Sequence, residues 1–170
     1  DFHLGVPDAA TSLIREKKIV RWLDEIKSEA QAIFLLGDIF DFWFEYGHVS
    51  PNGYSRLLGK LAELSDSGIK IHWFTGNHDM WIFNYLPEEI GFTLYRQPVI
   101  RSMNDRVFFI GHGDGLGPGD RGYKFIKKVF ANKLCQWMFK WIHPEVGMAM
   151  GEFWSRKSRK STHTEKEKFL

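Results

Sequence analysis

Apolar positions recur along the chain with two different periods, which predicts alternating helices and strands. Between residues 12 and 30 they fall on one stripe of a helix, with charged residues opposite. Residues 54–67 repeat this pattern, and Gly68 ends the predicted helix. Short continuous apolar runs, typical of strands buried on both faces, occur at residues 32–36, 69–75 and 106–110. This alternation of strand and helix predicts an α/β fold.

The last third of the chain has a different pattern, built from aromatic and basic residues. Residues 121–142 present an apolar stripe at helical spacing, which predicts one helix. Pro144 ends it, because a residue that precedes proline avoids the helical conformation. A second helix is predicted over about 145–157, so the two helices form a hairpin. Residues 155–168 are polar and charged, and we expect a frayed tail there.

Length and composition are those of one globular domain, which we assign to residues 1–170 with an insert at about 120–160. The chain is 44% apolar and 26% charged, which argues against intrinsic disorder. Its single cysteine, Cys135, excludes an internal disulfide and a cysteine-based zinc cage. No apolar run reaches the ~18 residues that a membrane span requires.

The charged residues are distributed unevenly. Residues 1–120 contain 11 Lys and Arg against 17 Asp and Glu, whereas residues 121–160 contain 10 Lys and Arg against two Glu. An acidic body therefore carries a basic insert. This asymmetry favours an anionic partner, which can be a phosphate, a nucleic acid or a lipid surface.

Each apolar run ends in glycine followed by residues that bind metals, and a D-x-H pair opens the chain. The groups are Asp1 with His3, Asp38 with Asp41, Asn77-His78-Asp79, and His112 with Asp114. Ligand sites in α/β sheets lie beyond the carboxyl ends of the strands, so these groups are expected to converge. Carboxylate, imidazole and amide together suit Mn, Fe or Zn better than Ca, and their number indicates a two-metal centre. The alternative is that each aspartate serves only as a helix cap or turn residue.

In this order, D-x-H, G-D, G-N-H-D and G-H-x-D resemble the motifs of the calcineurin-like metallophosphoesterases. The resemblance implies a four-layer fold, with a β-sandwich flanked by helices, and here an inserted helical cap. It also implies a dinuclear metal site. Asp1 and His3 would bind one metal, Asn77 and His112 the other, and Asp38 would bridge both.

The same resemblance assigns two catalytic residues. His78 would contact the scissile phosphate, and Asp79 would orient His78. Carboxylate orientation of a histidine is a common device around metal sites.

Longer stretches are similar to one branch of that family, the UDP-2,3-diacylglucosamine pyrophosphatases of lipid A synthesis. They are F-L-L-G-D-I-F-D-x-W from Phe34, G-H-G-D-G from Gly111 and G-D-R-G-Y from Gly119. Members of this branch hydrolyse the pyrophosphate of UDP-2,3-diacylglucosamine to UMP and 2,3-diacylglucosamine 1-phosphate. The resemblance implies this reaction, with two divalent ions, and we expect Mn2+. The implied substrate contacts are Asn77, Asp114, Tyr123, Ser155, Arg156 and Arg159.

Two features of the family pattern do not occur in this sequence. The family has an apolar first strand before D-x-H, and a late G-H-x-H motif that supplies two more metal ligands. Neither is present in residues 1–170, so we expect the chain to be part of a longer protein. His78 also stands where many members of the branch carry arginine.

The insert has two interpretations. In the first it is a cap, with Lys127 and Lys128 on a basic edge that rests on an anionic leaflet. The cap would enclose acyl chains between Phe125, Val129, Phe130, Trp137, Met138 and Trp141. In the second, the hairpin simply packs on the sheet or on a partner chain.

The expectation from the first interpretation is a cytoplasmic enzyme, peripheral on the inner face of the bacterial inner membrane. Its partner is the lipidated nucleotide-sugar substrate, and we expect no nucleic acid and no protein partner. Two other hypotheses stay open. One is a metallophosphoesterase that acts on nucleotides or nucleic acid, and the other is a non-catalytic homologue that keeps the fold as a binding surface.

Overall fold

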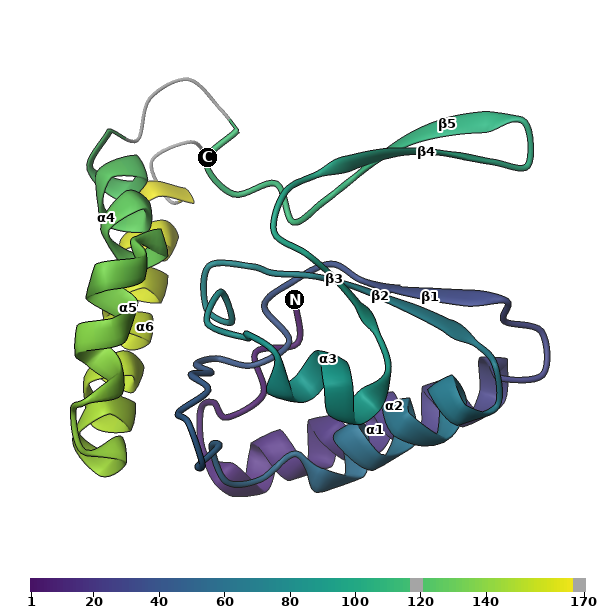
Figure 1. The fold of residues 1–170 in the computed structure, drawn as a ribbon, viewed down its shortest axis with the longest axis horizontal. Helices are drawn as coiled ribbons and strands as arrows, with labels where there is room; N and C mark the ends of the chain where they lie inside the picture. Colours follow the sequence, from purple (N-terminus) through teal and green to yellow (C-terminus); the bar gives the residue numbers. More distant parts are fainter. Residues whose placement is uncertain (117–120, 167–170) are drawn as a thin grey trace.

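The computed structural model describes residues 1–116 and 121–166, with side chains described as far as Ser158 in the last helix. Its centre is a parallel sheet in the order β1-β2-β3. The strands are β1 (Ala32–Leu35), β2 (Lys70–Phe74) and β3 (Thr93–Tyr95). One face of this sheet is covered by α1 (Ala9–Ile26), α2 (Ser55–Asp66) and α3 (Tyr85–Ile90) (Figure 1).

The main core lies between this sheet and the helices. Amphipathic α1 and α2 turn their apolar stripes inward, and the alternate residues of β1 and β2 meet them. The centre of this core is fully or almost fully buried and comprises Leu23, Ile33, Leu57, Leu61, Ile71 and Trp73. The core fixes the strands whose carboxyl ends carry the metal-binding motifs.

A second, two-stranded sheet lies on the side of the first sheet away from the helices (Figure 1). It is an antiparallel hairpin of β4 (Val99–Met103) and β5 (Arg106–Ile110). Asn104 and Asp105 form its turn with φ of 49° and 60°, the left-handed values that suit a two-residue hairpin loop. Ile100, Val107 and Phe109 on this hairpin are at least 65% exposed among the described residues.

Three helices form a separate cap beside the carboxyl ends of the strands (Figure 1). They are α4 (Arg121–Ala131), α5 (Lys133–Lys140) and α6 (Pro144–Lys166). The cap joins the body through a second apolar cluster, in which Phe42, Phe44 and Trp81 meet Phe130 and Phe139. In the part of the chain that the structure describes, no helix combines the length and the apolar character needed to cross a membrane.

The prediction of an α/β fold with helices, two sheets and an inserted helical cap is confirmed. The prediction of one helix over 121–142 is wrong, because Asn132 interrupts it. The Asn132 side chain accepts hydrogen bonds from the amides of Leu134 and Cys135 and so begins a new helix there. The predicted frayed tail is wrong as far as Lys166, since α6 continues to that residue and contains no proline after Pro144 and no glycine after Gly151. Residues 167 and 168 of that prediction lie outside the described residues.

Candidate metal centre

The candidate ligands lie at the start of the chain and in the loops that follow β1, β2 and β5. His3 and Leu4 run parallel to the segment after β1, with the His3 amide bonded to the Asp38 carbonyl at 2.9 Å. Asn77 and His78 follow β2, the neighbour of β1. The segment after β5 brings His112 to the same place, where its Nδ1 lies 2.8 Å from the Leu36 carbonyl. The structure therefore brings the four motifs together beyond the carboxyl ends of β1 and β2.

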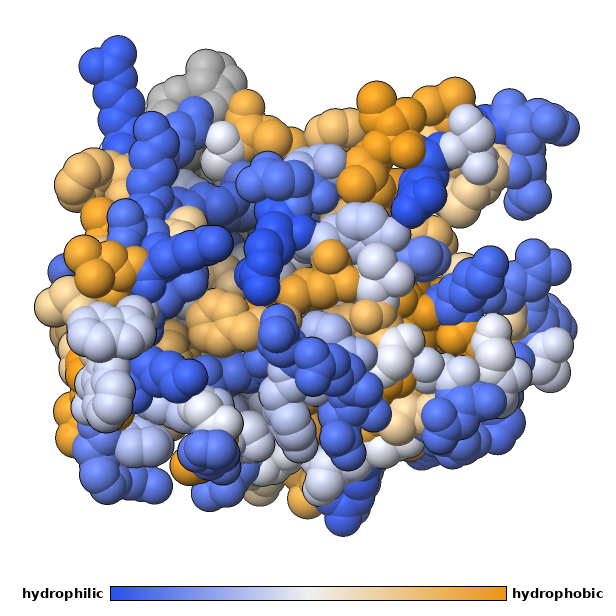
Figure 2. Space-filling model, in the orientation of Figure 1, coloured by the Kyte–Doolittle hydropathy of each residue, from blue (hydrophilic) through white to orange (hydrophobic). Residues whose placement is uncertain are grey.

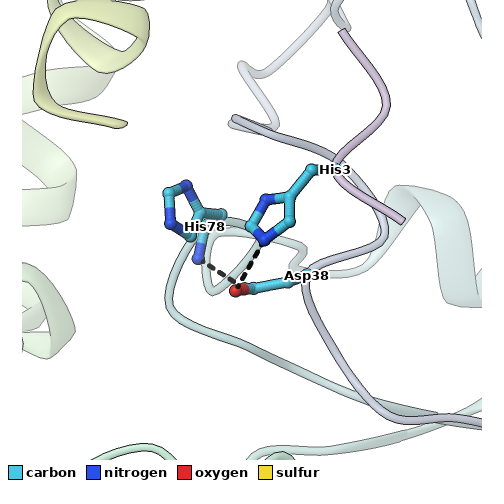
Figure 3. Close-up of side chains that lie close together, drawn as sticks. All are labelled: His3, Asp38 and His78. Carbon is cyan, nitrogen blue, oxygen red and sulfur yellow. Dashed lines mark hydrogen bonds and ion pairs between the residues drawn. The ribbon is translucent and has the colours of Figure 1, made fainter. Parts of the chain in front are cut away.

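Asp38 lies at the centre of the candidate ligands and is 3% exposed. Its Oδ2 is 3.7 Å from His3 Nε2 and 3.4 Å from His112 Nε2. Its Oδ1 accepts a hydrogen bond from the His78 amide at 2.9 Å. Figure 3 shows His3 and His78 meeting at this carboxylate from separate segments. One carboxylate thus has both His3 and His112 as neighbours.

Two groups of side chains around Asp38 could each hold an ion. The first is His3, Asp38 and His78, and the second is Asp1, Asp38 and His112, with ligand atoms within 4.8 Å of one another in each. Asn77 joins the second group, because its Oδ1 lies 3.3 Å from His112 Nε2. Carboxylate, imidazole and amide oxygen are donors that fit a divalent transition metal.

The backbone of this centre adopts uncommon conformations. Asp38 and His3 have φ of 51° and 43°, in the left-handed region that non-glycine residues seldom occupy. Gly76 allows the close approach of the two loops, since a Cβ there would lie 2.1 Å from Asp38 Oδ1. Packing of the surrounding core therefore holds the ligand loops in a geometry that local preference disfavours.

Asp38 and three ionisable groups near it have shifted pKa values. Burial alone would raise the pKa of Asp38, but the hydrogen bond with His112 and the nearby His78 hold it below its usual value. The hydrogen bond with Asp38 raises the pKa of His112 to about 8. Burial lowers the pKa of His78. Burial, together with the charge of Asp38, raises the pKa of Asp79 to about 6.

The Asp79 side chain has a different set of partners from the one expected. Its two oxygens accept hydrogen bonds from the amides of Gly76 (2.7 Å) and Ile39 (2.9 Å), so it ties the β2 loop to the β1 loop. The His78 ring is oriented by Asp41, whose carbonyl lies 2.8 Å from Nδ1. Because a carbonyl oxygen only accepts, Nδ1 carries the proton. Asp79 thus holds the backbone that presents His78, and Asp41 holds the ring.

A buried carboxylate fixes the segment that follows His78. Glu45 accepts hydrogen bonds from four consecutive amides, those of Phe83, Asn84, Tyr85 and Leu86, at 2.7–3.1 Å. The Arg96 guanidinium donates to the carbonyls of Met80 and Ile82 in the same segment. Glu45 thereby satisfies the open amides at the start of α3. Neither contact could be predicted from the periodicity of the sequence.

The predicted substrate contacts lie at different distances from the centre. Tyr123 in α4 donates a hydrogen bond to Asp114 Oδ2, and the charge of Asp114 acts on His112 two residues before it. Ser155 is buried and donates to Asp41. Arg156 is exposed on α6. The side chain of Arg159 lies outside the described residues.

Sequence reasoning placed Asp41 among the metal-binding groups without a specific role, and it predicted neither the role of Arg15 nor the partner of Lys127. Asp41 contacts His3, His78 and the cap, although only its position in G-D-I-F-D pointed to it. Arg15 donates to the carbonyls of Phe2, His3 and Val6 and so fixes the first ligand loop. Lys127 forms an ion pair with Asp114 at 2.6 Å, so its charge lies beside the segment that carries His112.

Comparison with known proteins gives the family of this chain. Residues 1–164 match the family model of calcineurin-like phosphoesterases, and the chain belongs to that family.

Curated relatives narrow the similarity to one branch of the family. The chain is 40% identical over 164 residues to the UDP-2,3-diacylglucosamine hydrolase of Porphyromonas gingivalis, covering 95% of this chain and 62% of that protein. It is 30% identical to the protein of the same name from Edwardsiella ictaluri, covering 82% of this chain and 52% of that protein. A Proteus mirabilis protein of that name is 28% identical over 100% of this chain and 69% of its own length. The chain thus spans about half to two thirds of these relatives.

Proposed function

We propose that the protein hydrolyses the pyrophosphate bond of UDP-2,3-diacylglucosamine, releasing UMP and 2,3-diacylglucosamine 1-phosphate in lipid A biosynthesis. The observation that carries this proposal is the position of a metal-type ligand cluster directly beside a cap with exposed apolar side chains. A substrate with a charged pyrophosphate and two acyl chains needs both surfaces. The named relatives, 40% and 30% identical, support the same substrate class.

The proposed metal centre holds two divalent ions that share Asp38, with Mn2+ as the proposed metal. Asp1 groups with Asp38 and His112, near Asn77, whereas the resemblance pairs it with His3, which groups with Asp38 and His78. When bound, such ions act as Lewis acids toward phosphoryl oxygens and the attacking water. The pKa of about 8 for His112 means that a metal must displace a proton there, which favours loading at higher pH.

His78 is proposed to stabilise the charge that develops on the phosphoryl group. Asp41 engages its Nδ1 proton, so the other ring nitrogen is the one that can contact a phosphoryl oxygen. Burial lowers the pKa of the ring, whereas an arriving phosphate favours its cationic form. A donor fixed in advance toward the developing charge is an efficient catalytic device.

Asp114, Tyr123 and Lys127 form a polar group on the cap side of His112. We propose that this group, with Asn77, Arg156 and Arg159, contacts the polar part of the substrate. Lys127 supplies a positive charge beside the site, where an anionic pyrophosphate would sit.

The proposed function is tested by assaying the purified intact protein on three substrates with added Mn2+. Rapid release of UMP from UDP-2,3-diacylglucosamine, well above the rates on bis-p-nitrophenyl phosphate and DNA, is the expected result. Preference for DNA or for bis-p-nitrophenyl phosphate would assign a different phosphoesterase activity. Absence of turnover on all three, with no bound metal, would indicate a non-catalytic binding protein.

The cap residues separate into two sets that predict different mutant phenotypes. Trp137 and Trp141 are 58% and 76% exposed, whereas Phe130 packs on Trp81 and Trp154. Figure 2 shows apolar side chains along the outer edge of the cap. We propose that the exposed set receives the acyl chains.

Trp137→Gln is therefore expected to raise KM for the diacylated substrate by about 10-fold or more, since contact of one large apolar side chain contributes roughly 1.5–3 kcal/mol. Hydrolysis of bis-p-nitrophenyl phosphate should stay unchanged. Phe130→Ala is the contrasting variant, and it should lower thermal stability and both activities because it joins the cap to the body. Loss of both activities in Trp137→Gln would show that Trp137 serves packing and not the lipid.

We also propose that the protein lies on the inner face of the bacterial inner membrane as a peripheral protein. Lys128 and Lys133 are exposed on the cap, unlike Lys127. Lys128→Glu with Lys133→Glu should weaken binding to vesicles that contain anionic lipid, and added salt should have the same effect. Lys18→Glu, on the exposed side of α1, is the matched control in a vesicle flotation assay. Equal flotation of the double variant and the control would remove the basis for a membrane location.

A further inference from the structure

One face of α6 lies directly against the body through residues spaced four apart. These are Gly147, Gly151 and Ser155. A Cβ at Gly151 would lie 2.2 Å from the Phe42 ring, so the helix approaches as closely as glycine allows. Ser155 is the polar member of this stripe and is 5% exposed. The cap is therefore seated on the body along a line that ends at a buried hydroxyl.

The hydroxyl of Ser155 meets the residue that lies behind the metal centre. Ser155 Oγ donates a hydrogen bond of 2.6 Å to Asp41 Oδ2. Asp41 Oδ1 lies 3.5 Å from His3 Nδ1, and the Asp41 carbonyl accepts from His78 Nδ1 at 2.8 Å. Asp41 is itself 3% exposed. One buried residue thus touches the cap, a candidate metal ligand and the proposed phosphate-contacting histidine.

We propose that Asp41 is a positioning residue that couples the seating of α6 to the metal centre, with Ser155 as its partner on the cap. A carboxylate at the second nitrogen of a metal-binding histidine fixes the ring and raises its affinity for the ion. The bond from Ser155 fixes that carboxylate, so an unseated cap leaves His3 less well oriented. The inference rests on the metal centre proposed above and does not depend on which lipid is the substrate.

The coupling has to work in both directions. If seating α6 strengthens metal binding, metal binding must stabilise the seated α6 by the same factor. This reciprocity separates the proposal from two simpler roles. Mutation of a residue that only contacts substrate would alter neither the metal affinity nor the seating of the cap. Mutation of a residue that only supports folding would lower stability by the same amount with and without metal.

The first test measures Mn2+ affinity by titration calorimetry in the intact protein. Ser155→Ala is expected to weaken binding by about 3- to 10-fold, which is what one hydrogen bond contributes. Asp41→Ala should weaken it by about 10- to 100-fold, as loss of a partner behind a metal ligand does. Adding Ser155→Ala to Asp41→Ala should cause no further loss, because the serine acts through the aspartate. Ser158→Ala, one turn further along α6 and exposed, is the matched control.

The second test measures hydrogen exchange of the α6 amides with and without Mn2+. We expect Mn2+ to protect residues 144–158 in the wild-type protein and in Ser158→Ala, and to lose this effect in Ser155→Ala. Turnover of bis-p-nitrophenyl phosphate at limiting Mn2+ should fall in Ser155→Ala in proportion to metal affinity. That substrate has no acyl chain, so a lipid contact of Ser155 would leave its turnover unchanged.

Three results would overturn the proposal. They are unchanged Mn2+ affinity in Ser155→Ala, an additive loss in the double variant, and α6 exchange that does not respond to Mn2+. Failure of the proposed function looks different, because the protein would then bind Mn2+ with the predicted coupling and yet not hydrolyse UDP-2,3-diacylglucosamine.

Discussion

Asp38→Ala is expected to remove most of the bound Mn2+ and with it nearly all phosphoesterase activity. Asp38 is the only described carboxylate that lies within 4 Å of both His3 and His112, so its loss affects both proposed ion sites. The affinity for Mn2+ should fall by more than about 100-fold, because the loss of a residue that only positions a metal ligand already lowers the affinity by up to that factor. Metal content after dialysis, measured by mass spectrometry, checks this.

Two variants make the Asp38 experiment specific. Asn77→Ala removes a ligand of one proposed site only and should retain more metal. Asp38→Asn keeps an acceptor for the His78 amide, so it separates loss of metal from loss of the hydrogen bond that joins the two loops. Full and equal metal occupancy in Asp38→Ala would show that the bridging assignment is wrong.

His78→Ala is expected to lower kcat by ~10²–10³-fold, the usual loss when one preorganised contact to the developing charge is removed. Metal content should stay close to that of the wild-type protein. The geometry gives this experiment a second possible answer, because His78 also belongs to the group of His3 and Asp38 that could hold an ion. Kinetics on bis-p-nitrophenyl phosphate and metal analysis of the same preparation distinguish the two.

His48→Ala is the matched control, since His48 is an exposed histidine outside the centre. Loss of metal together with activity in His78→Ala would make His78 a ligand. The roles of the G-N-H-D residues would then have to be reassigned, with Asn77 and His78 both facing ions.

The sequence predicted the parts of the site that depend on strand ends. Asp38, Asn77 and His78 follow buried strands, and parallel neighbours in one sheet necessarily bring such ends together. Short elements escaped prediction, because α3 has six residues and β3 has three, too few to show a period. Asn132 could have been recognised as a helix cap, yet the apolar stripe on both sides concealed the break.

Contacts between the cap and the body could not be predicted from the pattern of the sequence. Ser155 and Asp41 are 114 residues apart, and neither periodicity nor motif spacing relates them. The helical pattern around Lys127 likewise predicts which side of the helix carries it, but it does not predict that this side contacts Asp114. These pairings are decided by how α6 and α4 dock, which depends on the complementary shapes of Gly151 and Phe42 and similar contacts.

The separation of Asp41 from Ser155 also has a consequence for how the protein is made. At about 5–20 residues per second, a ribosome needs about 6–23 s to synthesise the 114 residues between them. During that interval His3, Asp38 and His78 have already been made, and the hydroxyl that fixes Asp41 does not yet exist. Contacts that close such long loops form late in folding. The nascent chain therefore presents His3, Asp38 and His78 before Ser155 is available to hold Asp41, so the proposed tight binding of metal is expected only after the cap has been synthesised.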